Sequence, residues 1–199
     1  MPGGRPRAFD PDAALDSALE VFWSQGYEGT AISDLTAAMG VNRPSLYAAF
    51  GNKEELFHKV LDRYMQGPGG FTSRALEAPR ARDVVEGLLY GAVELTAGPG
   101  TPRGCLSVGC VQACGPEAEP VRQEVAARRK AGEAALRTRL ERARDEGDLP
   151  GDCDPADLAR LVTALTDGIA VAAAGGSSRQ ELLQLAGTAL RMAFTPGPG

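Results

Sequence analysis

The chain has 199 residues, of which 24% are charged, and its formal net charge at pH 7 is −5. That length supports one large or two small domains that bury a core without disulfide staples. No run of about eighteen apolar residues occurs, and the opening segment MPGGRPRAFD lacks the apolar stretch of a signal peptide. We therefore expect a soluble, cytoplasmic protein with no membrane partner. Its four cysteines lack the spacing of a secreted disulfide scaffold, which fits a reducing compartment.

The N-terminal residues are predicted to form a short arm followed by a helix. Arg5 and Arg7 lie in the segment GRPR, which is similar to the Gly-Arg-Pro core by which flexible arms enter A·T-rich minor grooves. A disordered tail that phosphates attract weakly is the alternative. The helix is expected from Pro11 to Gln25, with Gly26 at its C-terminal cap. Its apolar stripe consists of Leu15, Ala18, Leu19 and Phe22.

Residues 30–50 are predicted to form two short helices joined by a tight turn. In the first helix, Thr30 is the expected N-cap, and Gly40 is expected to end the helix in a left-handed conformation. In the second helix, Asn42 is the expected N-cap and Pro44 lies in the first turn, where its missing N–H is no loss. The residues expected to face inward are Ile32, Leu35, Met39, Leu46, Ala49 and Phe50, and those expected to face outward are Asn42, Arg43, Ser45, Tyr47 and Ala48. This is the pattern of a helix-turn-helix whose second helix suits a DNA major groove.

The segment VNRPSLYAAFGNKEELF, preceded by a helix that ends in GYEGT, resembles the DNA-binding domain of TetR-type transcriptional repressors. The shared pattern joins the turn glycine, a Leu-Tyr pair, Phe50 and Lys53 at fixed spacing. Together with the helical patterning, the resemblance implies an all-α fold of about nine helices. A homeodomain-like helix-turn-helix DNA-binding domain is expected over residues 1–66, and a helical effector-binding and dimerisation domain over residues 67–199.

The resemblance implies that residues 43–50 form the helix that reads DNA bases. Arg43 is the expected base reader, because its guanidinium matches the O6 and N7 acceptors of guanine, and such a pair is worth roughly 1–3 kcal/mol of discrimination. Tyr47 and Lys53 match positions that hold phosphate in relatives, Tyr47 through its hydroxyl and Lys53 through its charge beside a helix N-terminus. The other expected DNA contacts are Arg5, Arg7, Thr30, Ser33, Asn42, Pro44 and Ser45.

The charge balance of residues 1–66 is acidic, with six Lys or Arg against nine Asp or Glu, a net of −3. Phosphate contacts require local positive potential. We therefore expect DNA binding that is modest at physiological salt and depends on dimerisation.

The remaining helices are predicted from apolar periodicity between Gly- and Pro-rich breaks. A helix is expected from Asn52 to Gly67, and GPGG at 67–70 marks the domain boundary. Further helices are expected from Pro79 to GPGTPRG at 98–104 and over residues 117–147. The last of these carries the expected i, i+4 pairs Glu124/Arg128 and Glu133/Arg137.

The two final helices, DLARLVTALTDGIAVAAA and RQELLQLAGTALRMAF, are apolar over more than one narrow stripe. A monomer needs one such stripe, so we expect both helices to pack against their symmetry mates as a four-helix bundle in a homodimer. The expected interface consists of Leu158, Leu161, Val162, Leu165, Ile169, Leu182, Leu183, Ala186 and Leu190.

The C-terminal domain is also expected to enclose a pocket for a small-molecule effector. In relatives of this kind a ligand moves the fourth helix and separates the two reading heads, which lowers affinity for DNA. Such a ligand must bind the DNA-incompetent state better. The expected lining residues, which are equally compatible with plain core, are Leu89, Tyr90, Val93, Leu106, Val108, Val111 and Gln112.

Three cysteines, Cys105, Cys110 and Cys114, cluster within ten residues, and Cys153 lies in a distant loop. They fit three interpretations: small buried hydrophobic residues, a thiol-based redox or electrophile sensor, or metal ligands. The metal interpretation is weakened because no histidine lies nearby and the spacing matches no zinc motif. No cofactor is expected.

The alternative from another functional class is an enzyme. His58 is the chain's one histidine, however, and no nucleophile–base pair accompanies it, which argues against catalysis. A non-specific architectural DNA binder would need more positive charge. We therefore predict a sequence-specific regulator, a repressor released from a palindromic operator by its ligand, with an activator as the alternative.

Overall fold

The computed structural model describes residues 9–113, 115 and 118–194, and these form an all-α fold, as predicted. Ten α-helices and one short 3₁₀ helix lie in the described residues, where about nine helices were expected. They are α1 (Pro11–Gly29), α2 (Ile32–Met39), α3 (Arg43–Phe50), α4 (Lys53–Gln66), η1 (Pro68–Gly70), α5 (Phe71–Leu76), α6 (Ala81–Ala97), α7 (Leu106–Ala113), α8 (Glu119–Asp145), α9 (Pro155–Ala174) and α10 (Arg179–Ala193). α5 is absent from the sequence-based prediction because it is six residues long and too short to show a period.

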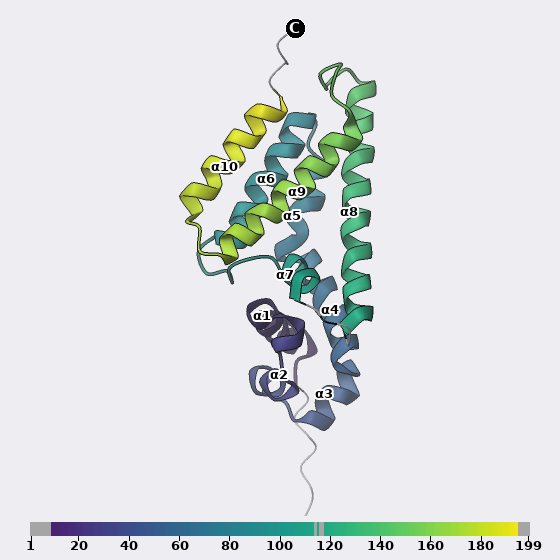
Figure 1. The fold of residues 1–199 in the computed structure, drawn as a ribbon. Helices are drawn as coiled ribbons and strands as arrows, with labels where there is room; N and C mark the ends of the chain where they lie inside the picture. The colour runs from purple at the N-terminus through teal and green to yellow at the C-terminus, as the bar shows by residue number, and fades with distance from the viewer. Residues whose placement is uncertain (1–8, 114, 116–117, 195–199) are drawn as a thin grey trace, which may run out of the picture.

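The helices form two groups that lie one above the other (Figure 1). The first three helices lie at the lower end, α4 leads upward from them, and α6, α9 and α10 form the upper layer beside the long helix α8. α7 lies between the two groups. α3, the helix expected to read DNA, is therefore held at one end of the molecule, away from the upper helices.

Two hydrophobic clusters correspond to these groups. Phe22, Leu35, Leu46 and Phe57 are among the fully buried side chains of the lower cluster. That cluster also contains Leu106 and Cys110 of α7 and Val121 and Val125 of α8. The upper cluster is built from buried residues of α6, α8, α9 and α10, including the predicted inward face of α6: Val84, Val85, Leu88, Leu89, Ala92 and Val93. The first half of α8 thus contributes to the lower cluster and its second half to the upper cluster.

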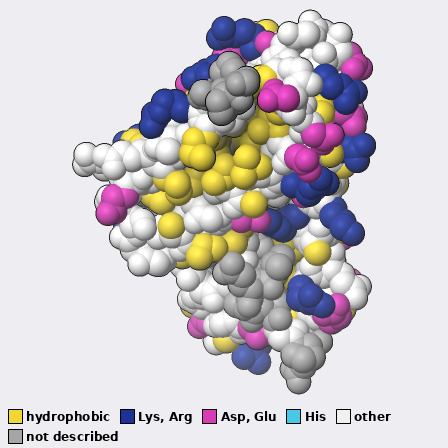
Figure 2. Space-filling view, turned by 45° about the horizontal axis from the view of Figure 1, so that its top comes forward, with side chains coloured by type: hydrophobic (Ala, Val, Ile, Leu, Met, Phe, Trp, Pro, Cys, Tyr) yellow, Lys and Arg dark blue, Asp and Glu magenta, His cyan; other side chains and the backbone are white. Residues whose placement is uncertain are grey.

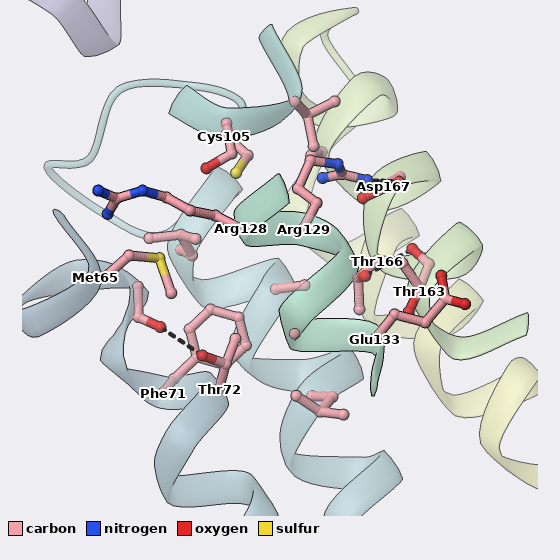
Figure 3. A pocket seen from close by; sticks show the side chains of 18 of the residues that line it. Met65, Phe71, Thr72, Cys105, Arg128, Arg129, Glu133, Thr163, Thr166 and Asp167 are labelled. Atoms are coloured by element: carbon pink, nitrogen blue, oxygen red, sulfur yellow. Dashed lines mark hydrogen bonds and ion pairs between the residues drawn. The ribbon is translucent and has the colours of Figure 1, made fainter. Parts of the chain in front are cut away.

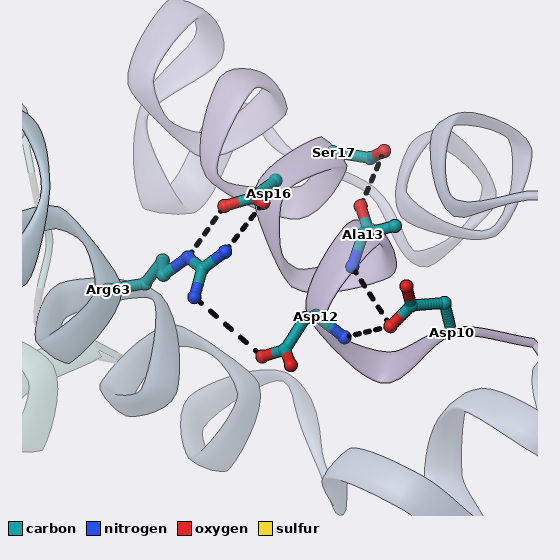
Figure 4. Close-up of polar contacts among 6 residues, drawn as sticks. All are labelled: Asp10, Asp12, Ala13, Asp16, Ser17 and Arg63. Carbon is teal, nitrogen blue, oxygen red and sulfur yellow. Dashed lines mark hydrogen bonds and ion pairs between the residues drawn. The ribbon is translucent and has the colours of Figure 1, made fainter.

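α4 is tied to α1 by charge as well as by apolar contact. The guanidinium of Arg63 donates from Nε and Nη2 to the two carboxylate oxygens of Asp16, each at 2.7 Å, and Nη1 lies 3.7 Å from Asp12 (Figure 4). Asp10 accepts from the backbone N–H groups of Asp12 and Ala13 and so caps α1. The Arg63 contacts thus tie the last turn of α4 to the first turns of α1.

The ion pairs along α8 agree with the sequence-based prediction in one case and contradict it in the other. Arg128 Nε lies 2.7 Å from Glu124, as expected. Arg137, expected to pair with Glu133, instead pairs with Glu141 at 2.7 Å, one turn toward the C-terminus. In the described part of the chain, no helix combines the length and the apolar character needed to span a bilayer.

Candidate nucleic-acid interface and ligand cavity

The corner between α2 and α3 has the geometry of a helix-turn-helix. Gly40 adopts the predicted left-handed conformation, with φ 65° and ψ 30°, and Val41 N donates to Thr36 O at 3.1 Å. Asn42 Oδ1 accepts from Ser45 N at 2.9 Å, which confirms Asn42 as the N-cap of α3. These bonds set the start of α3, the helix expected to read DNA.

Thr30 does not cap α2, contrary to the prediction. The N-cap is Ala31, whose backbone N–H donates to Asp34 Oδ2 at 3.0 Å. Thr30 is 1% exposed, and its hydroxyl donates to Gly26 O at 2.7 Å. Gly26 itself has φ 74° and interrupts α1, so the regular helix ends at Gln25 as predicted and an extra turn follows. The Thr30 hydroxyl fastens this turn and does not face solvent.

α3 presents a polar face to solvent. Leu46 and Phe50 are buried, whereas Arg43, Pro44 and Tyr47 are exposed, with 47% of the Tyr47 surface accessible. Ser33 of α2 is exposed beside them in the same corner. Ala49, expected to face inward, is exposed, because the buried side of this short helix is narrower than predicted. The outward face of α3 therefore has the residues needed to contact a DNA groove.

The start of α4 is fixed by a complete capping box. Asn52 Oδ1 accepts from Glu55 N at 2.8 Å, and Asn52 N donates to Glu55 Oε2 at 2.9 Å. Lys53 Nζ lies 4.6 Å from the centroid of the Tyr27 ring, a cation–π contact that draws the ammonium toward the end of α1. Lys53 is thus held at the N-terminus of a helix, which is the setting expected for a phosphate contact.

Arg63 offsets part of the acidic balance of this region. Its hydrogen bonds hold the pKa of Asp16 below the ordinary value of 3.8. Asp16 and Asp12 are therefore engaged with a cation of α4. Arg5 and Arg7 of the predicted arm lie outside the described residues.

A cavity of about 450 Å³ opens between α4, α5, α6, α7, α8 and α9 (Figure 3). Its apolar wall includes Leu61, Leu88, Val108, Leu136 and Val162. Hydroxyl groups and charged side chains complete the lining, among them Thr72, Ser107, Thr163, Thr166, Arg128, Arg129, Glu133 and Asp167. An apolar chamber with a few polar groups at its edge suits a small amphipathic molecule.

The cavity lies on a different face of α6 from the one predicted. Of the five expected lining residues whose side chains the structure describes, Val108 lines it and the other four do not. Leu89 and Val93 are fully buried in the upper core, and the hydroxyl of Tyr90 points toward Gly187 of α10. Leu106 belongs to the lower core, and the side chains of Val111 and Gln112 lie outside the description. The α6 residues at the cavity are Leu88, Ala92, Leu95 and Thr96, and the first two lie one position before the predicted Leu89 and Val93.

Comparison with known proteins identifies the family. Residues 14–60 match "Bacterial regulatory proteins, tetR family", and residues 81–186 match "Tetracyclin repressor-like, C-terminal domain". The HTH-type transcriptional repressor ComR of Escherichia coli strain K12 is 34% identical over 191 residues, which cover 95% of this chain and 91% of ComR. The chain belongs to the TetR family of transcriptional regulators.

Two further TetR-type relatives agree with this assignment. The HTH-type regulator YezE of Bacillus subtilis strain 168 is 31% identical over 161 residues, covering 80% of this chain and 83% of YezE. The structure of a cysteine mutant of the TetR regulator CifR, complexed with 26-base-pair double-strand operator DNA, has 41% identity and a TM-score of 0.88. This structural match covers 94% of this chain and 98% of the CifR chain. As a member of this family, the protein is a DNA-binding transcriptional regulator.

The predicted dimer interface of this TetR regulator requires correction. Six of its nine residues are buried within the protomer and leave no surface for a partner: Leu158, Val162, Ile169, Leu182, Ala186 and Leu190. Leu165 and Leu183 are partly buried, and Leu161 is 49% exposed. The error arose because α9 and α10 each carry two apolar faces, and the prediction chose the face that packs inside the protomer.

The outer faces of α9 and α10 carry exposed apolar side chains. Val171 is 44% exposed, Leu185 42% and Met192 76%, and with Leu161 they are four of the six large hydrophobic residues exposed among those described. Figure 2 shows hydrophobic side chains gathered in a broad patch on the upper half of the molecule. We call these four residues the α9–α10 patch. Exposed apolar side chains gathered on one part of a surface are typical of an interaction site.

The cysteines of this TetR regulator lie in distinct settings. Cys105 lines the cavity, and its Sγ lies 3.2 Å from the hydroxyl of Tyr64 on α4. Burial raises the pKa of Tyr64 well above 10.0, so the phenol keeps its proton, and either the hydroxyl or the thiol can donate in this contact. Cys110 is 2% exposed within the lower core, and burial together with nearby aspartates raises the pKa of Cys153. Cys114 lies outside the described residues, and in the described part no cluster of three or more His, Cys, Asp or Glu side chains could hold a metal ion.

Proposed function

We propose that the protein is a repressor that binds a palindromic operator as a homodimer and leaves it when a small molecule occupies the cavity. The observation that carries this proposal is the exposed polar face of α3, held by the Gly40 turn and the Asn42 cap at the end of the molecule. The relative whose structure is bound to operator DNA has the same fold at 41% identity, which supports the same docking of α3 in a major groove.

In this proposal each residue of the corner has a role. Arg43 reads guanine, while Ser33, Pro44 and Ser45 contact bases or backbone. Tyr47 and Lys53 hold phosphates, and Asn42 acts chiefly through its cap. Thr30 is not among the proposed DNA contacts, since its side chain is buried and its hydroxyl donates to Gly26 O. We keep residues 1–66 as the DNA-binding unit, with Arg5 and Arg7 on its arm.

The second copy of the chain is proposed to cover the α9–α10 patch. Ala164 and Gly168 lie on the exposed side of α9 between Leu161 and Val171, and such small residues allow helices to approach closely. A two-fold axis through this face would place the two α3 helices on one side of a duplex, as a palindrome requires.

The small molecule is proposed to bind in the cavity lined by α4. Because Leu61, Tyr64 and Met65 of α4 form part of its wall, a ligand that fits best when α4 has moved disfavours the DNA-competent arrangement. By linkage, operator DNA must weaken binding of that ligand by the same factor.

A thiol sensor is the second candidate, favoured by the position of Cys105. Its sulfur lies at the cavity and contacts Tyr64 of α4, so an adduct on Cys105 would disturb the same helix. The CifR relative was solved as a cysteine mutant, which draws attention to cysteines in that protein. Titration of operator binding with peroxide or N-ethylmaleimide, on the wild type and on Cys105→Ser, tests this candidate. Release of the wild type alone supports a sensor, and no release of either protein rules it out.

Selection of bound duplexes from a random DNA pool tests the proposed function itself. The expected product is a palindrome whose half-sites lie at least one helical turn apart, because the protein reads DNA twice. Fusion of that operator to a reporter promoter then gives the sign of regulation, and removal of the protein should raise expression. Lower expression would make it an activator, and recovery of unrelated sequences would contradict specific reading.

A further inference from the structure

Two neighbouring residues of α4 form ion pairs in opposite directions. Arg63 reaches back to Asp16 and Asp12 of α1, within the DNA-binding helices (Figure 4). Asp62 reaches forward to α8, where its Oδ1 accepts from Arg128 Nη1 at 2.6 Å. α4 is therefore joined by charge to the reading head on one side and to the regulatory helices on the other.

Arg128 also lines the ligand cavity. In Figure 3 its side chain extends toward the side of the cavity where Met65 of α4 lies, while Arg129 is directed toward Asp167. The Arg128 guanidinium bonds Glu124 through Nε at 2.7 Å and Asp62 through Nη1, which uses two of its five N–H donors. One side chain thus contacts α4 and also faces the space proposed for the ligand.

Apolar contacts extend this connection to α1. Tyr64, two residues after Asp62, packs edge-on against Trp23 of α1 with ring centroids 5.1 Å apart. Trp23 Nε1 in turn donates to Gly104 O at 2.9 Å, at the start of α7. A shift of α4 at Asp62 would therefore change contacts of α1 as well.

We propose that Arg128 is a positioning residue that links the cavity to the DNA-binding helices: its pair with Asp62 holds α4 in the DNA-competent arrangement. The inference rests on the proposed function and names the contact through which the cavity controls it. The high similarity of the whole fold to the operator-bound relative supports the assignment of this arrangement to the competent state. A cavity ligand with an acceptor oxygen that takes the guanidinium would compete directly with Asp62.

The size of the effect follows from the exposure of the pair. The side chains of Arg128 and Asp62 are 32% and 57% exposed, so solvent screens their attraction. A pair of this kind changes an equilibrium by roughly two- to fivefold. A change of this size suits a regulatory contact, because it favours one position of α4 without preventing α4 from moving to another.

The test compares Asp62→Asn, Arg128→Gln and the double variant by amide hydrogen exchange in α4, which needs neither DNA nor ligand. Each single variant should speed exchange in α4 roughly two- to fivefold, and the double variant should add nothing further. Glu124→Gln, which removes the other partner of Arg128, and Glu119→Gln, which breaks the Arg122 pair of α8, are the matched controls and should leave α4 unchanged. Unchanged exchange in Asp62→Asn, or additive effects, would overturn the inference whether or not the protein binds DNA.

Operator affinity of the same variants separates this inference from the proposed function. If α4 is held as proposed, Asp62→Asn and Arg128→Gln bind the selected operator two- to fivefold more weakly, while circular dichroism shows that the helices remain folded. Wild-type affinity in both variants overturns the inference and leaves the proposed function intact. Failure of the wild type to bind any selected duplex would contradict the proposed function, while hydrogen exchange in α4 would still test the Asp62–Arg128 contact.

Discussion

Leu185→Ala is the substitution that best tests whether the α9–α10 patch is a dimer interface. Leu185 is 42% exposed in the protomer, so a partner can bury that fraction of its surface. Complete burial of a leucine is worth about 1.5–3 kcal/mol, so the remaining fraction contributes about 0.6–1.3 kcal/mol. A two-fold interface contains the side chain twice, which doubles the loss to about 1.3–2.5 kcal/mol.

That loss corresponds to a dimer dissociation constant raised roughly 10- to 70-fold. Analytical ultracentrifugation over a range of concentrations measures it, and circular dichroism checks that the helices remain. Tyr47→Ala is the matched control, because Tyr47 is similarly exposed, at 47%, but lies on α3. It should leave the dissociation constant unchanged while it weakens DNA binding. An unaltered constant in Leu185→Ala, or a wild type that stays monomeric at micromolar concentration, would refute the assignment of this face.

Three further substitutions test the DNA-binding helices. Asn42→Ala removes the side-chain oxygen that accepts from Ser45 N and should cost about 0.5–2 kcal/mol of stability. Asn42→Ser keeps an acceptor and should cost less. Chemical denaturation measures both losses, and equal losses would contradict the capping role. Lys53→Ala should weaken operator and random DNA alike and reduce the salt slope of log affinity by about one per half-site, which fluorescence anisotropy at several salt concentrations measures. Asp16→Asn should lower stability by up to about 1 kcal/mol at pH 7, because Arg63 holds the pKa of Asp16 below 3.8 and the pair is partly exposed. A depressed pKa contributes stability above the ordinary pKa and loses it as pH falls through the lowered value, so the wild type and Asp16→Asn should converge in acid. A difference that grows below pH 4 would contradict the pairing.

The first four helices could be predicted from the sequence because their signals are local. Gly40, Asn42 and Asn52 each act on backbone groups within a few residues, so cap chemistry alone places the helix ends. Thr30 shows where this reasoning fails. Its hydroxyl had two backbone groups within reach, and the interruption at Gly26 brought the carbonyl of that residue closer than the start of α2.

The cavity and the proposed dimer face could not be predicted, because they depend on how several helices are placed in space. α6 is apolar on a wide arc, and a rotation of one position decides whether Leu89 or Leu88 faces the cavity. α9 has an inner stripe through Val162 and an outer one through Leu161, and the sequence gives no reason to prefer either. The Asp62–Arg128 pair joins residues 66 positions apart and leaves no signal in local spacing.

The ratio of affinities for operator and random DNA in Arg43→Ala tests specific reading by α3 most directly. Arg43 is exposed on that helix, and loss of one bidentate contact to guanine costs roughly 1–3 kcal/mol per half-site. The ratio should therefore fall at least about fivefold for each half-site, while affinity for random DNA changes much less. If Arg43→Ala loses affinity equally for both duplexes, Arg43 does not read bases, and the assignment of α3 as the sequence reader is wrong.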